Sequence, residues 1–227
     1  MVDADFAEAF LRDQTNRFRK DLAVCLRGIR RKYHGNGRLT HAYFPAFMSC
    51  LSFLEFLSGF YAGDIEAFGA ASEKQIHSFA SAFLDRNRYS SHIINILWKG
   101  FRNKIAHLAH AYYVFDTSSV SGIGMGPLRI TWTISERQSD PHLLLESKAG
   151  KLRREVIPLT VPYDHILHVS LPVFRNDLLR AATMYSGSLR GDANRFDKFE
   201  KALKIMFALE TEGTDVSRGS TVRRAIP

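Results

Sequence analysis

Apolar residues repeat at helical spacing through most of the first half of the chain. Between residues 94 and 112 they fall three or four positions apart, which is the period of a helix that buries one side: Ile94, Trp98, Phe101, Ile105, Leu108 and Tyr112. Similar spacing predicts helices over residues 3–34 and 73–84, and the almost wholly apolar residues 43–62 predict a central helix. The expected caps are Asp3 or Asp5 for the first helix, Ser72 for the helix of residues 73–84, and Ser90 or Ser91 for the helix that carries residues 94–112. Residues 1–115 are therefore expected to form a bundle of four helices joined by short loops.

After residue 115 the period changes to that of strands. Ile130, Trp132 and Ile134 alternate with polar residues, which is typical of a half-buried strand. Further strands are expected at residues 142–148, 152–161 and 165–171, with turns at residues 139–141 and 149–150. Residues 116–171 are thus expected to form a small antiparallel β-meander that covers an apolar face of the bundle. The alternatives are a substrate groove, using Lys148, Lys151, Arg153 and Arg154, or a contact with a partner.

Helical spacing returns in the last part of the chain. Ser170, followed by Pro172, is expected to cap a fifth helix, and Asp192 a sixth. Residues 172–211 should pack back on the bundle as two helices, and residues 212–227, which lack apolar periodicity, should form a flexible basic tail. The fold class predicted is mainly α (α+β), with the β-meander between the fourth and fifth helices.

Composition narrows the class of partner. The chain has 227 residues, of which 45% are hydrophobic and 24% charged, as in an ordinary globular domain. Its net charge of +8 favours a polyanionic partner, nucleic acid first and an anionic membrane surface second. Cys25 and Cys50 form no CxxC pair, and the acidic first residues are unlike a signal peptide. Both features favour a cytoplasmic protein with free thiols.

The apolar segment of residues 43–62 is long enough to raise the question of a membrane span. Pro45, three serines and Glu55 make it a poor candidate, so a buried core helix is expected and no membrane partner. Glu55 would then need a partner, for which one of the many arginines is the obvious source. Alternatively, it can orient catalytic residues.

The chemistry that stands out lies on the helix of residues 95–113. At 100° per residue, Asn103, His107 and His110 fall opposite the apolar stripe, and Arg102 lies at its border. A merely solvated face would more often carry Lys and Glu. An imidazole titrates near neutrality and can move a proton at a 2′-hydroxyl, while a guanidinium fork can hold phosphoryl oxygens. Arg102 and His107 are therefore the candidate catalytic residues, with Asn103 orienting His107 or the phosphate.

The segment Arg102-Asn103-x-x-x-His107 resembles the motif of the HEPN family. This resemblance implies a helical bundle whose members are often ribonucleases acting as toxins or defence effectors, without a metal or other cofactor. It also implies a site at a two-fold interface, hence a homodimer, and an antitoxin or other protein partner. The β-meander has no place in the minimal HEPN bundle.

RNA is the expected substrate and partner. A basic run in the first helix is either a solvated face or a surface for a phosphate backbone. The candidate nucleic-acid-binding residues are Arg27, Arg30, Arg31, Lys32, Lys99 and His110. His107 and His110 are at metal-ligand spacing, but no carboxylate lies near them in sequence, so no metal site is expected.

These observations predict a HEPN-like, metal-independent endoribonuclease. The alternative is a non-enzymatic nucleic-acid-binding or protein-assembly module of the same fold. A third possibility, a membrane-surface protein, requires the helix of residues 43–62 to face lipid.

Overall fold

The computed structural model describes residues 2–30, 43–102, 114–119, 126–153 and 160–208. Its described helices are α1 (Ala4–Arg30), α2 (Tyr43–Ala62), α3 (Ala70–Phe83), α4 (Ser91–Asn95), the π-helix η1 (Ile96–Arg102), the short 3₁₀ helix η2 (Thr117–Ser119), α6 (Leu171–Ser188) and α7 (Ala193–Met206). The strands are β1 (Phe115–Asp116), β2 (Arg129–Ser135), β3 (Leu144–Arg153) and β4 (Thr160–Ser170). The fold is mainly helical α+β, as predicted. Among the described α-helices, the sheet lies between the fourth, α4, and the fifth, α6, also as predicted.

Polar side chains start four of the helices as the sequence indicates. Each accepts a hydrogen bond from a backbone N–H in the first turn, which otherwise lacks a partner; they are Asp3, Ser90, Ser170 and Asp192. Ser72 is an exception, because α3 begins two residues earlier after Gly69 and encloses it. Residues 31–34 of the predicted first helix and the predicted tail, residues 212–227, lie outside the described residues.

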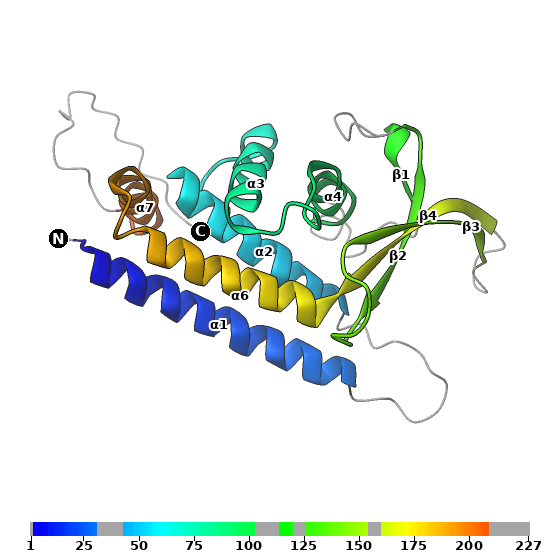
Figure 1. Ribbon diagram of the computed structural model, residues 1–227, viewed down its shortest axis with the longest axis horizontal. Coiled ribbons are helices and arrows are strands. Elements are labelled where there is room, and N and C mark those ends of the chain that lie inside the picture. The colour runs from blue at the N-terminus through cyan, green and yellow to red at the C-terminus, as the bar shows by residue number, and fades with distance from the viewer. Residues whose placement is uncertain (1, 31–42, 103–113, 120–125, 154–159, 209–227) are drawn as a thin grey trace, which may run out of the picture.

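Helix α2 is the element around which the other helices pack. It contacts α1, α3, α6, α7 and η1, and α1 and α6 lie side by side along it (Figure 1). Phe47 and Phe60 of α2 are fully buried, as is Phe199 of α7. Among the described helices, α2 alone is long and apolar enough to cross a membrane, but 61% of its most apolar stretch is buried in the protein. This is weak support for a membrane span.

The sheet is mixed, so the predicted antiparallel meander is wrong. Its strand order is β1-β2-β4-β3, and β2 pairs in parallel with β4, while the β1–β2 and β3–β4 pairs are antiparallel. Alternation of apolar and polar residues identifies a strand but not its neighbour, and β4 inserts between β2 and β3.

The boundaries of β3 also differ from the prediction. The expected turn at residues 149–150 is an irregularity between Ser147 and Gly150, and the strand continues to Arg153. A side chain at Gly150 would collide with the Tyr163 ring, so this glycine permits close approach of β4 instead of marking a turn. The structure describes two parts of the predicted strand 152–161. Residues 152–153 belong to β3, and residues 160–161 belong to β4.

The sheet closes one end of the helical bundle (Figure 1). Trp132 of β2 packs edge-on against Phe44 of α2 and Phe101 of η1, with ring centroids 5.4 and 6.0 Å apart. Leu167 and Val169 of β4 are buried in the same hydrophobic cluster as the helices. The sheet therefore covers an apolar face of the bundle, and both share one core.

Candidate functional site

The helix that carries the motif is not a uniform α-helix. After five α-helical residues in α4, the chain continues as the π-helix η1, in which each turn holds more residues. The predicted 100° rotation per residue is therefore wrong across η1, although Trp98 and Phe101 are buried as expected. The Phe115 ring packs against Gly100, so an added Cβ at this position would lie only 3.3 Å from that ring.

Arg102 ends η1 and is held by two elements. Its Nη2 donates to both carboxylate oxygens of Glu55 in α2 at 3.0 Å, and its Nε donates to Glu55 Oε2 at 3.3 Å. The guanidinium carbon also lies 4.8 Å from the centroid of the Trp98 ring. A carboxylate at its edge and an indole under its face together restrict the guanidinium to one orientation.

Glu55 thus has the arginine partner that its place in an apolar helix requires. Ser72 of α3 also donates to Glu55 Oε1, at 3.4 Å, so α2, α3 and η1 meet at this carboxylate. The side chains of Arg102 and Glu55 remain 28% and 30% exposed. The pair is therefore accessible from solvent, and water weakens its attraction.

A row of polar contacts joins α3 to α4 and η1, and we call it the polar seam. His77 Nε2 lies 2.7 Å from Asn95 Oδ1, and Glu73 forms an ion pair with Lys99 at 3.1 Å. The polar side of α4 and of the first residues of η1 thus packs against α3. Lys99, predicted to bind nucleic acid, directs its charge to Glu73 with only 17% of its side chain exposed.

The structure places only some of the predicted site residues. Arg102 and Lys99 lie as just described, and Arg27 is exposed on α1. Five other candidates lie outside the described residues: Asn103, His107, His110, Arg31 and Lys32. Arg30 ends α1, and only its backbone is described. The predicted convergence of Arg102 and His107 thus stays a prediction.

Sequence reasoning missed two residues that position Arg102. Trp98 was assigned only to the apolar stripe, and Ser72 only to a helix cap. The spacing of four residues between Trp98 and Arg102 is a usable signal, because side chains one turn apart can touch. Nothing local in the sequence connects Ser72 to Glu55.

The arrangement can orient a cation at a partly exposed surface. The bonds to Glu55 use Nε and Nη2, and Nη1 takes no part in them. An arginine held in this way can offer its remaining N–H groups to a phosphoryl oxygen without losing its orientation. Among the described residues, no group of three or more His, Cys, Asp or Glu side chains is placed to hold a metal ion.

A second polar cluster lies buried between the sheet and α6. Asp177 of α6 accepts hydrogen bonds from Arg88 at 2.8 Å and from the Tyr89 hydroxyl at 3.0 Å. The Ser170 N–H donates to His142 Nδ1 at 3.2 Å, so the proton of neutral His142 is on Nε2, 3.1 Å from the Tyr89 hydroxyl. Every member of this chain of bonds has a partner, which suits a structural role.

Burial sets the protonation state of this cluster. Burial first, and then the nearby Arg88 charge, lower the pKa of His142 from 6.5 to about 3. Burial likewise raises the pKa of Tyr89, helped by the Asp177 carboxylate. Both groups therefore stay neutral near neutral pH, and the cluster ties the loops before α4 and β3 to α6.

No family model, curated protein or solved structure matches this chain.

Proposed function

We propose that this protein is a HEPN-like endoribonuclease of the toxin or defence type, which cleaves RNA without a metal ion. The proposal starts from the Arg102-Asn103-x-x-x-His107 motif. The observation that carries it is the setting of Arg102, whose guanidinium is fixed by Glu55 and Trp98 while 28% of its side chain stays exposed. A catalytic cation needs this combination of fixed orientation and access.

The proposed reaction uses the RNA's own 2′-hydroxyl. Its oxygen attacks the adjacent phosphorus while His107 removes the proton, and the bond from phosphorus to the 5′-oxygen breaks. The products are a 2′,3′-cyclic phosphate and a 5′-hydroxyl, the latter formed when the leaving oxygen takes up a proton. Arg102 holds a phosphoryl oxygen as negative charge builds on it, and Asn103 orients His107 or the phosphate.

A homodimer fits this chemistry. One imidazole cannot be both proton acceptor and proton donor in the same concerted step. If two motif helices meet at a two-fold axis, as the resemblance implies, His107 of the partner subunit can protonate the leaving oxygen. An antitoxin or other protein partner would then act by covering this interface.

One observation favours the alternative, a non-enzymatic nucleic-acid-binding or assembly module of the same fold. Glu55 neutralises the charge of Arg102, which weakens the attraction of Arg102 for a phosphate. Under this alternative the ion pair only fastens η1 to α2, and RNA is held on basic surfaces elsewhere.

Cleavage in the presence of a chelator tests the proposal. Purified protein incubated with total RNA and EDTA should produce fragments, and His107→Ala should abolish them. The control is His92→Ala, because His92 is an exposed histidine of α4 outside the motif. Fragments that persist unchanged in His107→Ala would assign the activity to a contaminant or another site. Salt-sensitive retention of RNA without cleavage would favour the alternative.

A further inference from the structure

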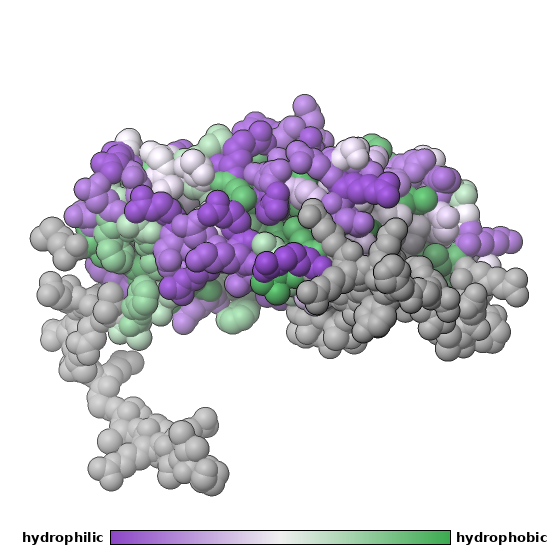
Figure 2. Space-filling view, turned by 90° about the horizontal axis from the view of Figure 1, so that it is seen from below, coloured by the Kyte–Doolittle hydropathy of each residue, from purple (hydrophilic) through white to green (hydrophobic). Residues whose placement is uncertain are grey.

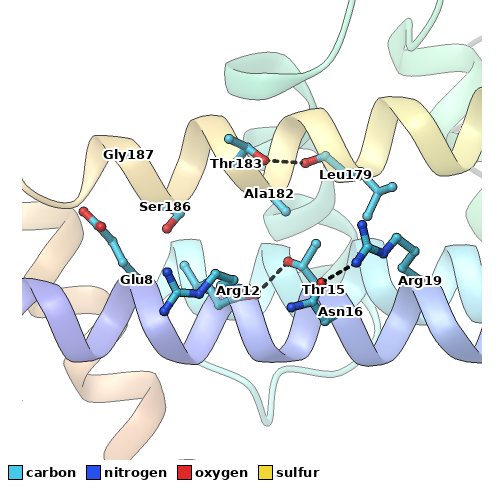
Figure 3. A pocket seen from close by; sticks show the side chains of 11 residues that line it. Glu8, Arg12, Thr15, Asn16, Arg19, Leu179, Ala182, Thr183, Ser186 and Gly187 are labelled. Carbon is cyan, nitrogen blue, oxygen red and sulfur yellow. Dashed lines mark hydrogen bonds between the residues drawn. The ribbon is translucent and has the colours of Figure 1, made fainter.

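A groove with a mixed polar and apolar lining runs between α1 and α6, away from Arg102. It encloses about 480 Å³. Arg12, Asn16 and Arg19 line it from α1, and Thr183 and Ser186 line it from α6 (Figure 3). Its floor is apolar, since Leu11 and Ala182 are buried. We call this feature the α1–α6 groove.

The groove carries net positive charge. Arg12 and Arg19 are exposed, and neither forms an ion pair with another described residue. By contrast, Arg17 of the same helix is paired with Asp13 at 2.9 Å. The one acidic residue of the lining, Glu8, is bound by Arg190, which lowers the pKa of Glu8.

The donors left over in the groove suit an anion that only accepts hydrogen bonds. The hydroxyls of Thr15 and Thr183 donate to backbone carbonyls of their own helices, at 2.6 and 3.0 Å. Asn16 accepts from Arg19 at 2.9 Å through its oxygen, which leaves its amide N–H groups. Together with the two guanidinium groups and Ser186, the groove therefore offers donors to phosphate oxygens.

The second cavity of the described residues has the opposite character. It encloses about 410 Å³ beside β2 and β4, and its lining includes Glu136, Asp140 and Arg137. The Tyr43 hydroxyl donates to Glu136 at 2.8 Å. Burial first, and then this bond to Glu136, raise the pKa of Tyr43. With two carboxylates and one arginine, this cavity does not attract an anion.

We infer that the α1–α6 groove binds the phosphate backbone of single-stranded RNA and holds a part of the substrate distant from the cleaved bond. That the ligand is RNA rests on the proposed function. Arg12 and Arg19 are seven residues apart, about 10.5 Å along the helix, and so engage separate phosphates of an extended strand. Beyond them, Arg27 is also exposed on α1, and hydrophilic side chains cover much of the face that α1 presents (Figure 2).

The groove acts apart from the Arg102 site. Helix α1 lies at the lower edge of the molecule with α6 beside it, whereas α3 and α4 lie farther from α1 (Figure 1). Binding in the groove therefore does not depend on the chemical step. Because the groove contacts phosphates, it does not read the base sequence, and the counterions that it releases raise the affinity for RNA.

Fluorescence anisotropy with a labelled 2′-O-methyl RNA oligonucleotide tests the inference, because this RNA lacks the attacking hydroxyl and stays intact. The double variant Arg12→Gln/Arg19→Gln should bind at least about tenfold more weakly than the unchanged protein. The slope of log affinity against log salt should become shallower by about 1.4, or 0.7 for each lost phosphate contact on a single strand.

The matched control is Arg17→Gln/Lys20→Gln, which removes the same charge from α1 outside the groove lining. It should retain most of the affinity, and both variants should melt at the temperature of the unchanged protein. Equal losses in the two variants, or no loss in the first, would overturn the inference.

A cleavage assay on unmodified RNA separates this inference from the proposed function. If the groove variant loses binding while even the unchanged protein cleaves nothing, the groove stands as a binding site and the ribonuclease proposal fails. If the groove variant cleaves and binds like the unchanged protein, the groove inference fails and the ribonuclease proposal stands.

Discussion

At the scale of single residues, Arg102 is the group on which the proposed chemistry depends. The sequence predicted that Glu55 needs an arginine, and that arginine proved to be the first residue of the motif. The sequence could not select it, because Glu55 and Arg102 are 47 positions apart and η1 departs from the assumed rotation. His107 lies outside the described residues, so its role rests on the motif.

Arg102→Lys tests whether the shape of the guanidinium matters in addition to its charge. A lysine cannot bond both Glu55 oxygens while lying flat on Trp98, so the free energy of unfolding should fall by about 1 kcal/mol. RNA cleavage should fall about a hundredfold, because the fixed donors to the phosphoryl oxygens are lost. Urea denaturation and initial cleavage rates measure the two effects.

The matched control is Arg129→Lys, whose arginine is 50% exposed and 3.9 Å from Asp116. It should change stability by less than about 0.5 kcal/mol and leave cleavage unchanged. An Arg102→Lys protein as active as the unchanged one would contradict the proposed role.

The buried His142 predicts that mild acid destabilises the fold. Its pKa is about 3 in the folded protein, against an ordinary value of 6.5, so below pH 6.5 the unfolded chain binds a proton that the folded chain does not. Its contribution to stability is complete above pH 6.5 and is lost as the pH falls toward 3. Between these values the loss is up to about 1.4 kcal/mol per pH unit.

Urea denaturation at about pH 7, 6 and 5 measures this dependence. His142→Gln should be less stable at neutral pH and should lose stability less steeply in acid. His92→Gln, a change at an exposed histidine, should keep the slope of the unchanged protein. An unaltered slope in His142→Gln would show that other groups cause the acid sensitivity.

At the scale of elements, local signals in the sequence located the helices well but not the sheet order. Caps such as Ser170 and Asp192 act within one turn, so a short window of sequence reveals them. The parallel pairing of β2 with β4 depends on contacts 35 residues apart, as between Thr133 and His168. Likewise, no local residue preference points to the π-helical turn of η1, which packs against α2 and the sheet.

The end of α2 gives a prediction at this scale. Gly63 follows α2 with a φ of 79°, and its N–H bonds to the Gly59 carbonyl at 2.9 Å. A Cβ there would also lie 3.2 Å from the backbone of Lys198 in α7. Gly63→Ala should therefore lower the free energy of unfolding by about 1–2 kcal/mol, measured by urea denaturation.

Gly191→Ala provides the comparison. A Cβ at Gly191 meets nothing within 4 Å, and its φ is not positive. This variant should unfold within about 0.5 kcal/mol of the unchanged protein. If the two alanine variants were equally stable, the backbone of Gly63 would not be the constraint described.

At the scale of the whole molecule, the basic charge and the proposed chemistry occupy different places. The sheet and the helices share one hydrophobic core, and the described residues form two surfaces that are candidates for contact with RNA. One contains Arg102 beside Glu55, and the other is the α1–α6 groove. The net charge of +8 and the basic run of the first helix indicated a polyanionic partner, but only the fold reveals which of these side chains share a groove with α6. RNA bound along α1 would add affinity to a site whose own arginine is neutralised.

The most direct measurement is an analysis of the ends produced from a defined RNA oligonucleotide in the presence of EDTA. The unchanged protein should yield a 2′,3′-cyclic phosphate and a 5′-hydroxyl, and a 2′-deoxy substitution at the cleaved position should block the reaction. His107→Ala should give no product. Cleavage that continues at the 2′-deoxy position, or at an unchanged rate in His107→Ala, would contradict the proposal that Arg102 and His107 act on one phosphodiester.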